Sequence, residues 1–298
     1  MFARGVTLCA ALAFSGCTPE PPAAAQVIAR NPSGWVASCA DWDEWDTAGP
    51  PFRVHGNTYY VGTCGITALL VAGDQGHVLI DGGTEAGAAA VAANIEALGF
   101  RLTDVKLLLH SHEHFDHVGG LAELQRRTGG RLLASAEAAP VLRSGVSAAE
   151  DPQAGMHEPF AAARVDGLVV DGQPVRLGAL SLTPVATPGH TPGALSWQWR
   201  SCEGRDCATI VYADSLSPIS RDGYRFSDHP AYVDAFRRGL ERLGNLDCTI
   251  LLTPHPSASG LRERLLQGDL AAGPTCSDYA AGIKVRLDER LLEDAGRK

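Results

Sequence analysis

One short segment concentrates residue types that bind transition metals. Residues 110–120 read His-Ser-His-Glu-His-Phe-Asp-His-Val-Gly-Gly, directly after the largely apolar run at 105–109. Imidazole and carboxylate groups are the usual protein ligands of zinc, at roughly 2.0–2.2 Å. A buried strand that ends in so many imidazoles is poorly suited to a hydrophobic core. The segment therefore predicts a metal site at the end of a strand.

The spacing within this segment fits two metals better than one. In an extended chain His112 and His114 point to the same side, because side chains alternate with a period of two. A turn at Phe115 would direct Asp116 and His117 to a neighbouring point, which gives two ligands for each of two metals. A solvated histidine-rich loop is the simpler alternative, but random clusters rarely carry this spacing behind a strand.

Two further histidines lie in turns at the ends of expected strands. His190 lies in Thr-Pro-Gly-His-Thr-Pro-Gly at 187–193, and His255 lies in Thr-Pro-His-Pro at 253–256. Loops at strand ends commonly carry functional side chains. Either histidine alone is more often a surface residue, but beside the cluster both become candidate ligands.

Composition describes an ordinary globular chain with a sizeable core. Of 298 residues, 45% are hydrophobic and 20% are charged. The formal net charge of −9, with no basic patch, argues against nucleic acid as a partner.

Residues 1–26 are expected to be a signal peptide. A short positive start at 1–4 precedes an apolar run at 6–14 that is too short to span a bilayer. Two processing routes fit: ordinary cleavage near residues 23–26, or lipidation of Cys17, because Ser15-Gly16-Cys17 resembles a bacterial lipoprotein signal. No composition break divides the remainder, so 27–298 is expected to be a single domain in an exported, periplasmic protein.

Export gives the cysteines a structural meaning. Six remain after the signal peptide: Cys39, Cys64, Cys202, Cys207, Cys248 and Cys276. An even number in an oxidising compartment predicts three disulfides, although six cysteines allow 15 pairings. Sequence neighbourhood favours Cys202–Cys207. Cys39–Cys64 would then tether the N-terminal arm to the first strands, and Cys248–Cys276 would close a loop that contains His255. A zinc knot is disfavoured because no Cys-x-x-Cys pair occurs.

The expected elements alternate between strands and helices without a linker. Strands are expected at 52–62, 66–71, 77–80, 105–109, 131–134, 168–170, 174–177, 180–186, 194–199, 209–212 and 248–252. Helices are expected at 85–98, 121–127, 136–143, 231–243, 257–266 and 277–293. Residues 31–51 are expected to form an irregular arm and 144–164 a long loop beside the site. Two packed sheets with helices on their outer faces fit this order best.

The motif His-x-His-x-Asp-His after a hydrophobic strand resembles the metallo-β-lactamase superfamily. The resemblance to the third subclass of class B β-lactamases covers 35–290, carried by 111–117, 187–193, Tyr-Ala-Asp-Ser-Leu-Ser at 212–217, and 253–256. It implies an α+β fold, the four-layer αβ/βα sandwich, with two mostly antiparallel or mixed sheets. The three disulfides also match an exported type of that subclass.

The resemblance also implies roles for individual residues. His112, His114 and His190 would hold a first Zn²⁺, and Asp116, His117 and His255 a second. Asp116 would also orient the nucleophile. Ser215, at the position of a metal-binding cysteine in the other subclasses, and Ser217 would bind the substrate carboxylate. Gln153 and His157 are candidate substrate contacts from the long loop. His110 falls outside the spacing, and Asp81 either supports a ligand or caps the helix near Glu85.

The implied activity is hydrolysis of the β-lactam amide of penicillins, cephalosporins and carbapenems by a metal-bound hydroxide, which confers antibiotic resistance. A monomer acting on small molecules is expected. The main alternative is a glyoxalase II-like enzyme, or a lactone or ester hydrolase of the same fold, in which Asp214 rather than Ser215 would lie at the metals. A non-enzymatic metal-binding protein is disfavoured, because three ligands per metal leave open coordination positions.

Overall fold

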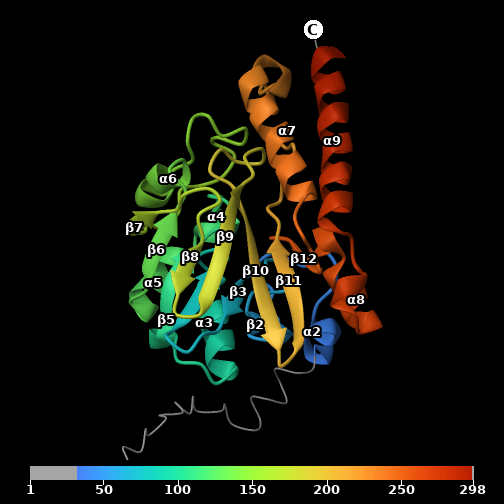
Figure 1. The fold of residues 1–298 in the computed structure, drawn as a ribbon. Coiled ribbons are helices and arrows are strands. Elements are labelled where there is room, and N and C mark those ends of the chain that lie inside the picture. The colour runs from blue at the N-terminus through green and yellow to red at the C-terminus, as the bar shows by residue number, and fades with distance from the viewer. Residues whose placement is uncertain (1–31, 297–298) are drawn as a thin grey trace, which may run out of the picture.

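The computed structural model describes residues 32–296, which form two packed β-sheets with helices on both outer sides (Figure 1). The first sheet has seven strands in sequential order. They are β1 (Phe52–His55), β2 (Thr58–Tyr60), β3 (Leu69–Val71), β4 (His77–Ile80), β5 (Val105–Leu109), β6 (Arg131–Ala134) and β7 (Val165–Leu168). The strands from β1 to β4 pair antiparallel, whereas β4 to β7 pair parallel.

The second sheet has five strands in the order β12-β11-β10-β9-β8. They are β8 (Val175–Leu177), β9 (Leu180–Ala186), β10 (Leu195–Glu203), β11 (Asp206–Tyr212) and β12 (Ile250–Leu252). Only the β11–β12 pair is parallel. The two sheets are therefore both mixed, as expected, and the second is mostly antiparallel.

The helices divide between the two outer faces. On one side lie α3 (Ala88–Ala97), α5 (Leu121–Thr128) and α6 (Ala138–Ser144); on the other lie α7 (Pro230–Gly244) and α9 (Cys276–Gly296), side by side (Figure 1). The described residues contain three further α-helices, α2 (Ser33–Ser38), α4 (Phe115–Val118) and α8 (Leu261–Gln267), and four short 3₁₀ helices.

Three hydrophobic clusters hold these four layers together. One joins α3, α5 and α6 to the first sheet, one lies between the sheets, and one joins α7 and α9 to the second sheet. The middle cluster contains the fully buried Trp197 and Tyr212. Burial of apolar surface on both faces of each sheet explains why β4 and β5 read as near-continuous hydrophobic runs rather than alternating ones. The four-layer fold expected from the sequence is confirmed.

The prediction of an irregular arm at 31–51 was partly wrong, because residues 33–38 form helix α2. Its Trp35 is only 1% exposed and packs edge-on against Phe52 and Tyr60. Burial of one indole thus fixes a helix too short to show a periodic pattern. The helix expected at 257–266 also differs: it begins as a 3₁₀ turn and restarts as α8 after Gly260, whose φ is +63°.

The structure contains the three expected disulfides, of which sequence neighbourhood had favoured Cys202–Cys207. Cys202 and Cys207 face each other across the β10–β11 hairpin. Cys39–Cys64 attaches the arm to the segment after β2, and Cys248–Cys276 attaches the start of α9 to the segment before β12.

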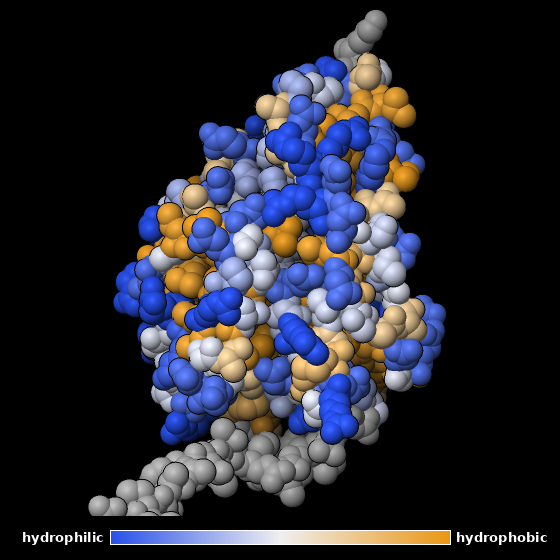
Figure 2. Space-filling model, in the orientation of Figure 1, coloured by the Kyte–Doolittle hydropathy of each residue, from blue (hydrophilic) through white to orange (hydrophobic). Residues whose placement is uncertain are grey.

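Hydrophilic side chains cover most of the face in Figure 2, with smaller apolar areas, including one along the protruding end of α7 and α9. No helix within residues 32–296 is long and apolar enough to cross a membrane. The expected signal peptide and the lipidation of Cys17 lie outside the described residues.

Replacing Cys248 and Cys276 together by serine is expected to lower the free energy of unfolding by about 3–4 kcal/mol at 25 °C, since the bridge spans 28 residues of the unfolded chain. The same change at Cys202 and Cys207, only 5 residues apart, should cost about 2 kcal/mol. Urea unfolding of both variants measures the difference. Equal losses, or free thiols at Cys248 and Cys276 in the folded protein, would contradict this account.

Candidate metal centre

The histidine-rich segment follows β5 at one end of the first sheet, and the turn that carries His190 joins β9 to β10 in the second sheet. A backbone hydrogen bond from Leu195 N to Ser111 O, 2.7 Å long, connects the two sheets directly beside both segments. Trp197 Nε1 donates a second bond, of 2.8 Å, to His110 O. The sandwich therefore brings ligands from distant parts of the chain to one place.

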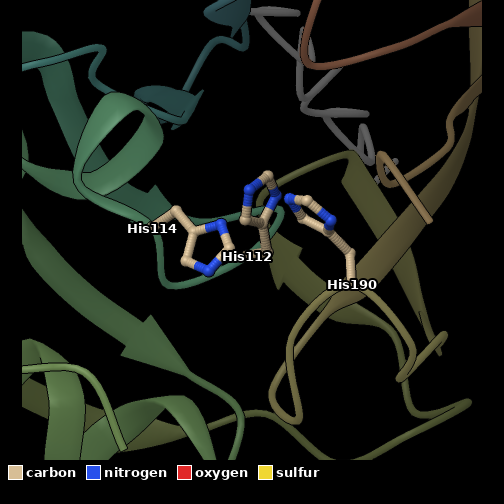
Figure 3. A group of neighbouring side chains, drawn as sticks. All are labelled: His112, His114 and His190. Carbon is tan, nitrogen blue, oxygen red and sulfur yellow. The ribbon is translucent and has the colours of Figure 1, made fainter. Parts of the chain in front are cut away.

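His112, His114 and His190 form a compact group of three buried imidazoles. Their rings turn toward one another (Figure 3), and one nitrogen from each lies within 4.8 Å of those of the other two. Their ring centroids are 4.8–5.0 Å apart. This is the donor set of a three-histidine zinc site.

Each of these three rings is oriented by an acceptor from one of two loops, the long loop or the segment after β11. Asp214 Oδ1 lies 2.8 Å from His112 Nδ1, and Asp151 Oδ2 lies 3.0 Å from His114 Nε2. The carbonyl of Ser217 lies 2.9 Å from His190 Nδ1. Acceptors of this kind fix which ring nitrogen carries the proton and leave the other free to bind a metal.

A second donor group adjoins the first. His112, Asp116 and His117 each offer an atom within 4.8 Å of the others, and all three are buried. Asp116 and His117 lie on the short helix α4, as the turn expected at Phe115 requires. His255 is not part of this compact group but lies beside it, with its Nε2 3.4 Å from Asp116 Oδ2 and its ring centroid 5.0 Å from that of His117.

Burial sets the protonation of most of these histidines. It lowers the pKa of His255 to about 4 and holds those of His112 and His190 well below the usual value. Burial is also the largest single effect on His114 and disfavours its charged ring, but the hydrogen bond to Asp151 and the charges of Asp151, Asp116 and Glu113 together outweigh it and raise the pKa. Burial is likewise the largest single effect on His117, but its contacts with Asp116 and the charges of Asp81 and Asp214 together raise the pKa of His117. Neutral imidazoles are the form that binds metals.

The buried nitrogens test whether a metal fits here. Within the described chain, His112 Nε2 is buried without a hydrogen-bond partner, and the two ring nitrogens of His117 lie 3.0 and 3.7 Å from the carboxylates of Asp116 and Asp81 but make no hydrogen bond of regular geometry. An unpaired buried polar group costs roughly 1–3 kcal/mol, so several together are unfavourable unless a cation occupies the space between them. The donor set of nitrogens and one carboxylate suits zinc.

Asp81 supports this region rather than a helix end. Its carboxylate accepts hydrogen bonds from Ser111 N at 2.6 Å, Ser111 Oγ at 2.7 Å and Tyr212 Oη at 2.7 Å, and it lies 3.7 Å from His117 Nδ1. Asp81 also has a φ of +64°, a strained value for a residue with a side chain. Of the two roles expected for it, the ligand-supporting one agrees with these contacts.

The proposed substrate-binding residues lie at the same place. Gln153 Nε2 is 3.4 Å from both ring nitrogens of His190. Ser215 is buried and its Oγ has no hydrogen-bond partner among the described residues, whereas Ser217 Oγ donates to Ser215 O at 3.4 Å. His110 lies outside both donor groups, where its Nε2 accepts from Ser135 N at 3.1 Å.

Aromatic side chains border the donor groups. The ring of Trp45, from the arm, lies 5.4 Å from Phe115 and 5.9 Å from His255. His157, from the long loop, lies 4.8 Å from Phe115 and 5.9 Å from His114. The arm and the long loop therefore both reach the site.

Sequence reasoning missed two buried carboxylates here, those of Glu113 and Asp151. Glu113 accepts hydrogen bonds from Thr191 Oγ1 and Gly193 N in the turn of His190. Its position between two histidines was the only available signal. Asp151 lies in a loop without periodicity, so nothing in the local sequence marked it.

Comparison with known proteins places this geometry in a family. The family model of the metallo-beta-lactamase superfamily matches residues 61–203. The solved structure of MIM-2 metallo-beta-lactamase is 57% identical, with a TM-score of 0.83 and coverage of 91% of this chain and 98% of that one. MIM-1 from Novosphingobium pentaromativorans is 46% identical, with a TM-score of 0.86 over 89% and 99%. MEM-A1, a subclass B3 enzyme from a soil metagenome library, is 42% identical, with a TM-score of 0.82 over 86% and 100%.

Curated relatives include hydroxyacylglutathione hydrolases. That of Bradyrhizobium sp. is 35% identical over 108 residues, which are 36% of this chain and only 33% of the relative. That of Anaeromyxobacter dehalogenans is 31% identical over 223 residues, 70% of this chain and 73% of the relative. The matches to solved metallo-β-lactamases are both closer in sequence and more complete. This chain belongs to the metallo-β-lactamase superfamily, as a hydrolase whose structural relatives are the subclass B3 enzymes.

Proposed function

We propose that this protein is a zinc-dependent β-lactamase that opens the lactam amide of penicillins, cephalosporins and carbapenems and so confers antibiotic resistance. The two adjoining donor groups support a hydrolase with two Zn²⁺ per chain. The similarity to MIM-2 over nearly its whole length supports the choice of substrate class.

In this proposal His112, His114 and His190 hold one zinc, and Asp116, His117 and His255 hold the other. Zinc bound there would supply a water that is nucleophilic at neutral pH and would polarise the lactam carbonyl. Asp116 lies between the other two proposed ligands of the second zinc: its Oδ2 is 3.0 Å from His117 Nε2 and 3.4 Å from His255 Nε2. From there its carboxylate orients the attacking water.

The remaining residues bind and orient the substrate. The hydroxyl of Ser215, which has no other partner among the described residues, donates to the carboxylate next to the lactam ring, and Ser217 assists directly or through water. Gln153 approaches from the long loop beside His190. The chain needs no nucleophilic serine or cysteine, so no covalent acyl-enzyme forms.

One observation favours this activity over a glyoxalase II-like thioesterase: the position of Asp214. In the rival enzymes the matching aspartate bridges the metals. Here Asp214 Oδ1 lies 2.8 Å from His112 Nδ1 and Oδ2 accepts from Leu216 N at 3.2 Å. Both oxygens of Asp214 therefore already have hydrogen-bond partners within the protein, and Asp214 belongs to neither donor group.

The proposed setting is the periplasm, as a monomer that acts on small molecules. The three disulfides support an oxidising compartment.

Zinc-reconstituted protein is expected to hydrolyse a carbapenem and a cephalosporin, to lose both activities in EDTA, and to leave a glutathione thioester intact. Absorbance assays of lactam opening and thioester cleavage, run side by side, measure all three substrates. Thioester turnover with inert lactams would instead assign the chain to the glyoxalase II-like activity.

Replacing His190 by alanine is expected to remove about one zinc per chain and to lower lactam turnover by at least ~100-fold, since one of three ligands to the first metal is lost. Metal analysis and steady-state kinetics measure the two effects. His229→Ala, an exposed histidine outside both donor groups, is the control. Full zinc content and full activity in His190→Ala would refute the ligand assignment.

Asp214→Asn is expected to weaken zinc binding by about 10–100-fold, because it alters the acceptor that orients His112. At saturating zinc the variant should still hold the parent number of ions, since Asp214 is not itself a ligand. Chelator competition gives the affinity, and metal analysis at saturation gives the number. A variant that lacks one ion even at saturation would show that Asp214 binds metal.

A further inference from the structure

Glu113 is the one residue between His112 and His114, yet it belongs to neither donor group. Its side chain is only 2% exposed. A buried carboxylate is costly unless it is well paired, because the charge loses its hydration. No ion pair between residues 32–296 includes Glu113, so its stabilisation comes from hydrogen bonds.

Both oxygens of Glu113 reach the turn of His190 in the other sheet. Oε2 accepts from Thr191 Oγ1 at 2.6 Å, and Oε1 accepts from Gly193 N at 2.8 Å. These donors lie one and three residues after His190, and Thr191 is fully buried. The carboxylate therefore spans the gap between the two segments that supply the three-histidine group.

The same turn is held from its other side by tight packing. Ser135 Oγ donates to Gly193 O at 2.8 Å, and a Cβ at Gly193 would lie only 2.6 Å from Ala138 N. Gly189 is likewise pressed against the ring of Phe236, 2.5 Å from where its Cβ would be. These contacts fix the turn to its surroundings, whereas Glu113 fixes it to the segment of His112 and His114.

We propose that Glu113 is a positioning residue that sets the separation between His190 and the His112–His114 pair, and thereby the affinity of the three-histidine group for zinc. The inference rests on the metal ligation proposed above. Without the carboxylate, Thr191 Oγ1 and Gly193 N would be buried and unpaired, and the turn would relax away from the other two ligands. This positioning role, through two hydrogen bonds to the turn of His190, explains why a buried acid is found at this position.

The test measures zinc affinity in a His255→Ala background, where only the three-histidine group keeps its full donor set. Glu113→Ala is expected to weaken zinc binding there by about 10–100-fold, measured by competition with a fluorescent chelator. Glu113→Gln should stay within about threefold of the parent, because its amide can accept from Gly193 N and donate to Thr191 Oγ1. Adding Thr191→Val to Glu113→Ala should cause no further loss, since the two changes break one connection.

Gln125→Ala provides the matched control. Gln125 is also buried and makes several hydrogen bonds, to Arg164 and Asp166, away from the donor groups. It should lower thermal stability and leave zinc affinity unchanged. If Glu113→Ala folds poorly, Thr191→Val alone preserves side-chain volume while it removes the bond to Glu113 Oε2, and it is expected to weaken zinc binding whereas Glu113→Gln is not.

Three results would overturn the inference: parent-like zinc affinity in Glu113→Ala, an equal loss in Glu113→Gln and Glu113→Ala, or additive losses in the double variant. Each differs from a failure of the proposed ligation. In that case the His255→Ala parent would itself bind no zinc tightly, before any change at Glu113.

Discussion

The whole site depends on the fact that an imidazole ring has two nitrogens, one on each side of the ring. A ring that offers one nitrogen to a metal must place the other against a hydrogen-bond acceptor, or the ring is free to rotate and to change tautomer. In this protein the acceptors for His112, His114 and His190 are Asp214, Asp151 and the Ser217 carbonyl; Asp151 lies in the long loop, and the other two lie in the segment after β11. The sandwich is the framework that brings three donors and three acceptors to one point.

A second constraint is the concentration of buried negative charge. Burial raises the pKa of Asp81 to about 6 and that of Glu113 to about 7, even though hydrogen bonds stabilise both carboxylates. Asp116, Asp151 and Asp214 are also buried in the same region. Divalent cations are the largest charges such a site can hold, and they would offset this density. The acids thus both orient the ligands and prepare the surroundings for a cation.

Two activities share the metal-binding motif, so the motif cannot separate them. What differs is where one carboxylate points. Asp214 lies in the loop after β11, and its oxygens face His112 Nδ1 and Leu216 N. The Ser215 hydroxyl, to which we assign the substrate carboxylate in the proposed function, has no hydrogen-bond partner among the described residues. In the proposed function, the choice of lactam over thioester chemistry therefore rests on the orientation of side chains within a shared fold.

The sequence by itself determined the features that are local along the chain. The spacing in 112–117, the apolar strand before it and the turns around His190 and His255 are short-range patterns, and they predicted the clustered histidines and the layered fold. Cys202–Cys207 was equally readable, because the partners flank one hairpin. Only the tertiary structure decided which carboxylate orients which ring, that Glu113 reaches Thr191, and that Trp35 anchors helix α2. Those contacts join segments far apart in sequence, and their geometry follows from how two sheets pack rather than from any local propensity.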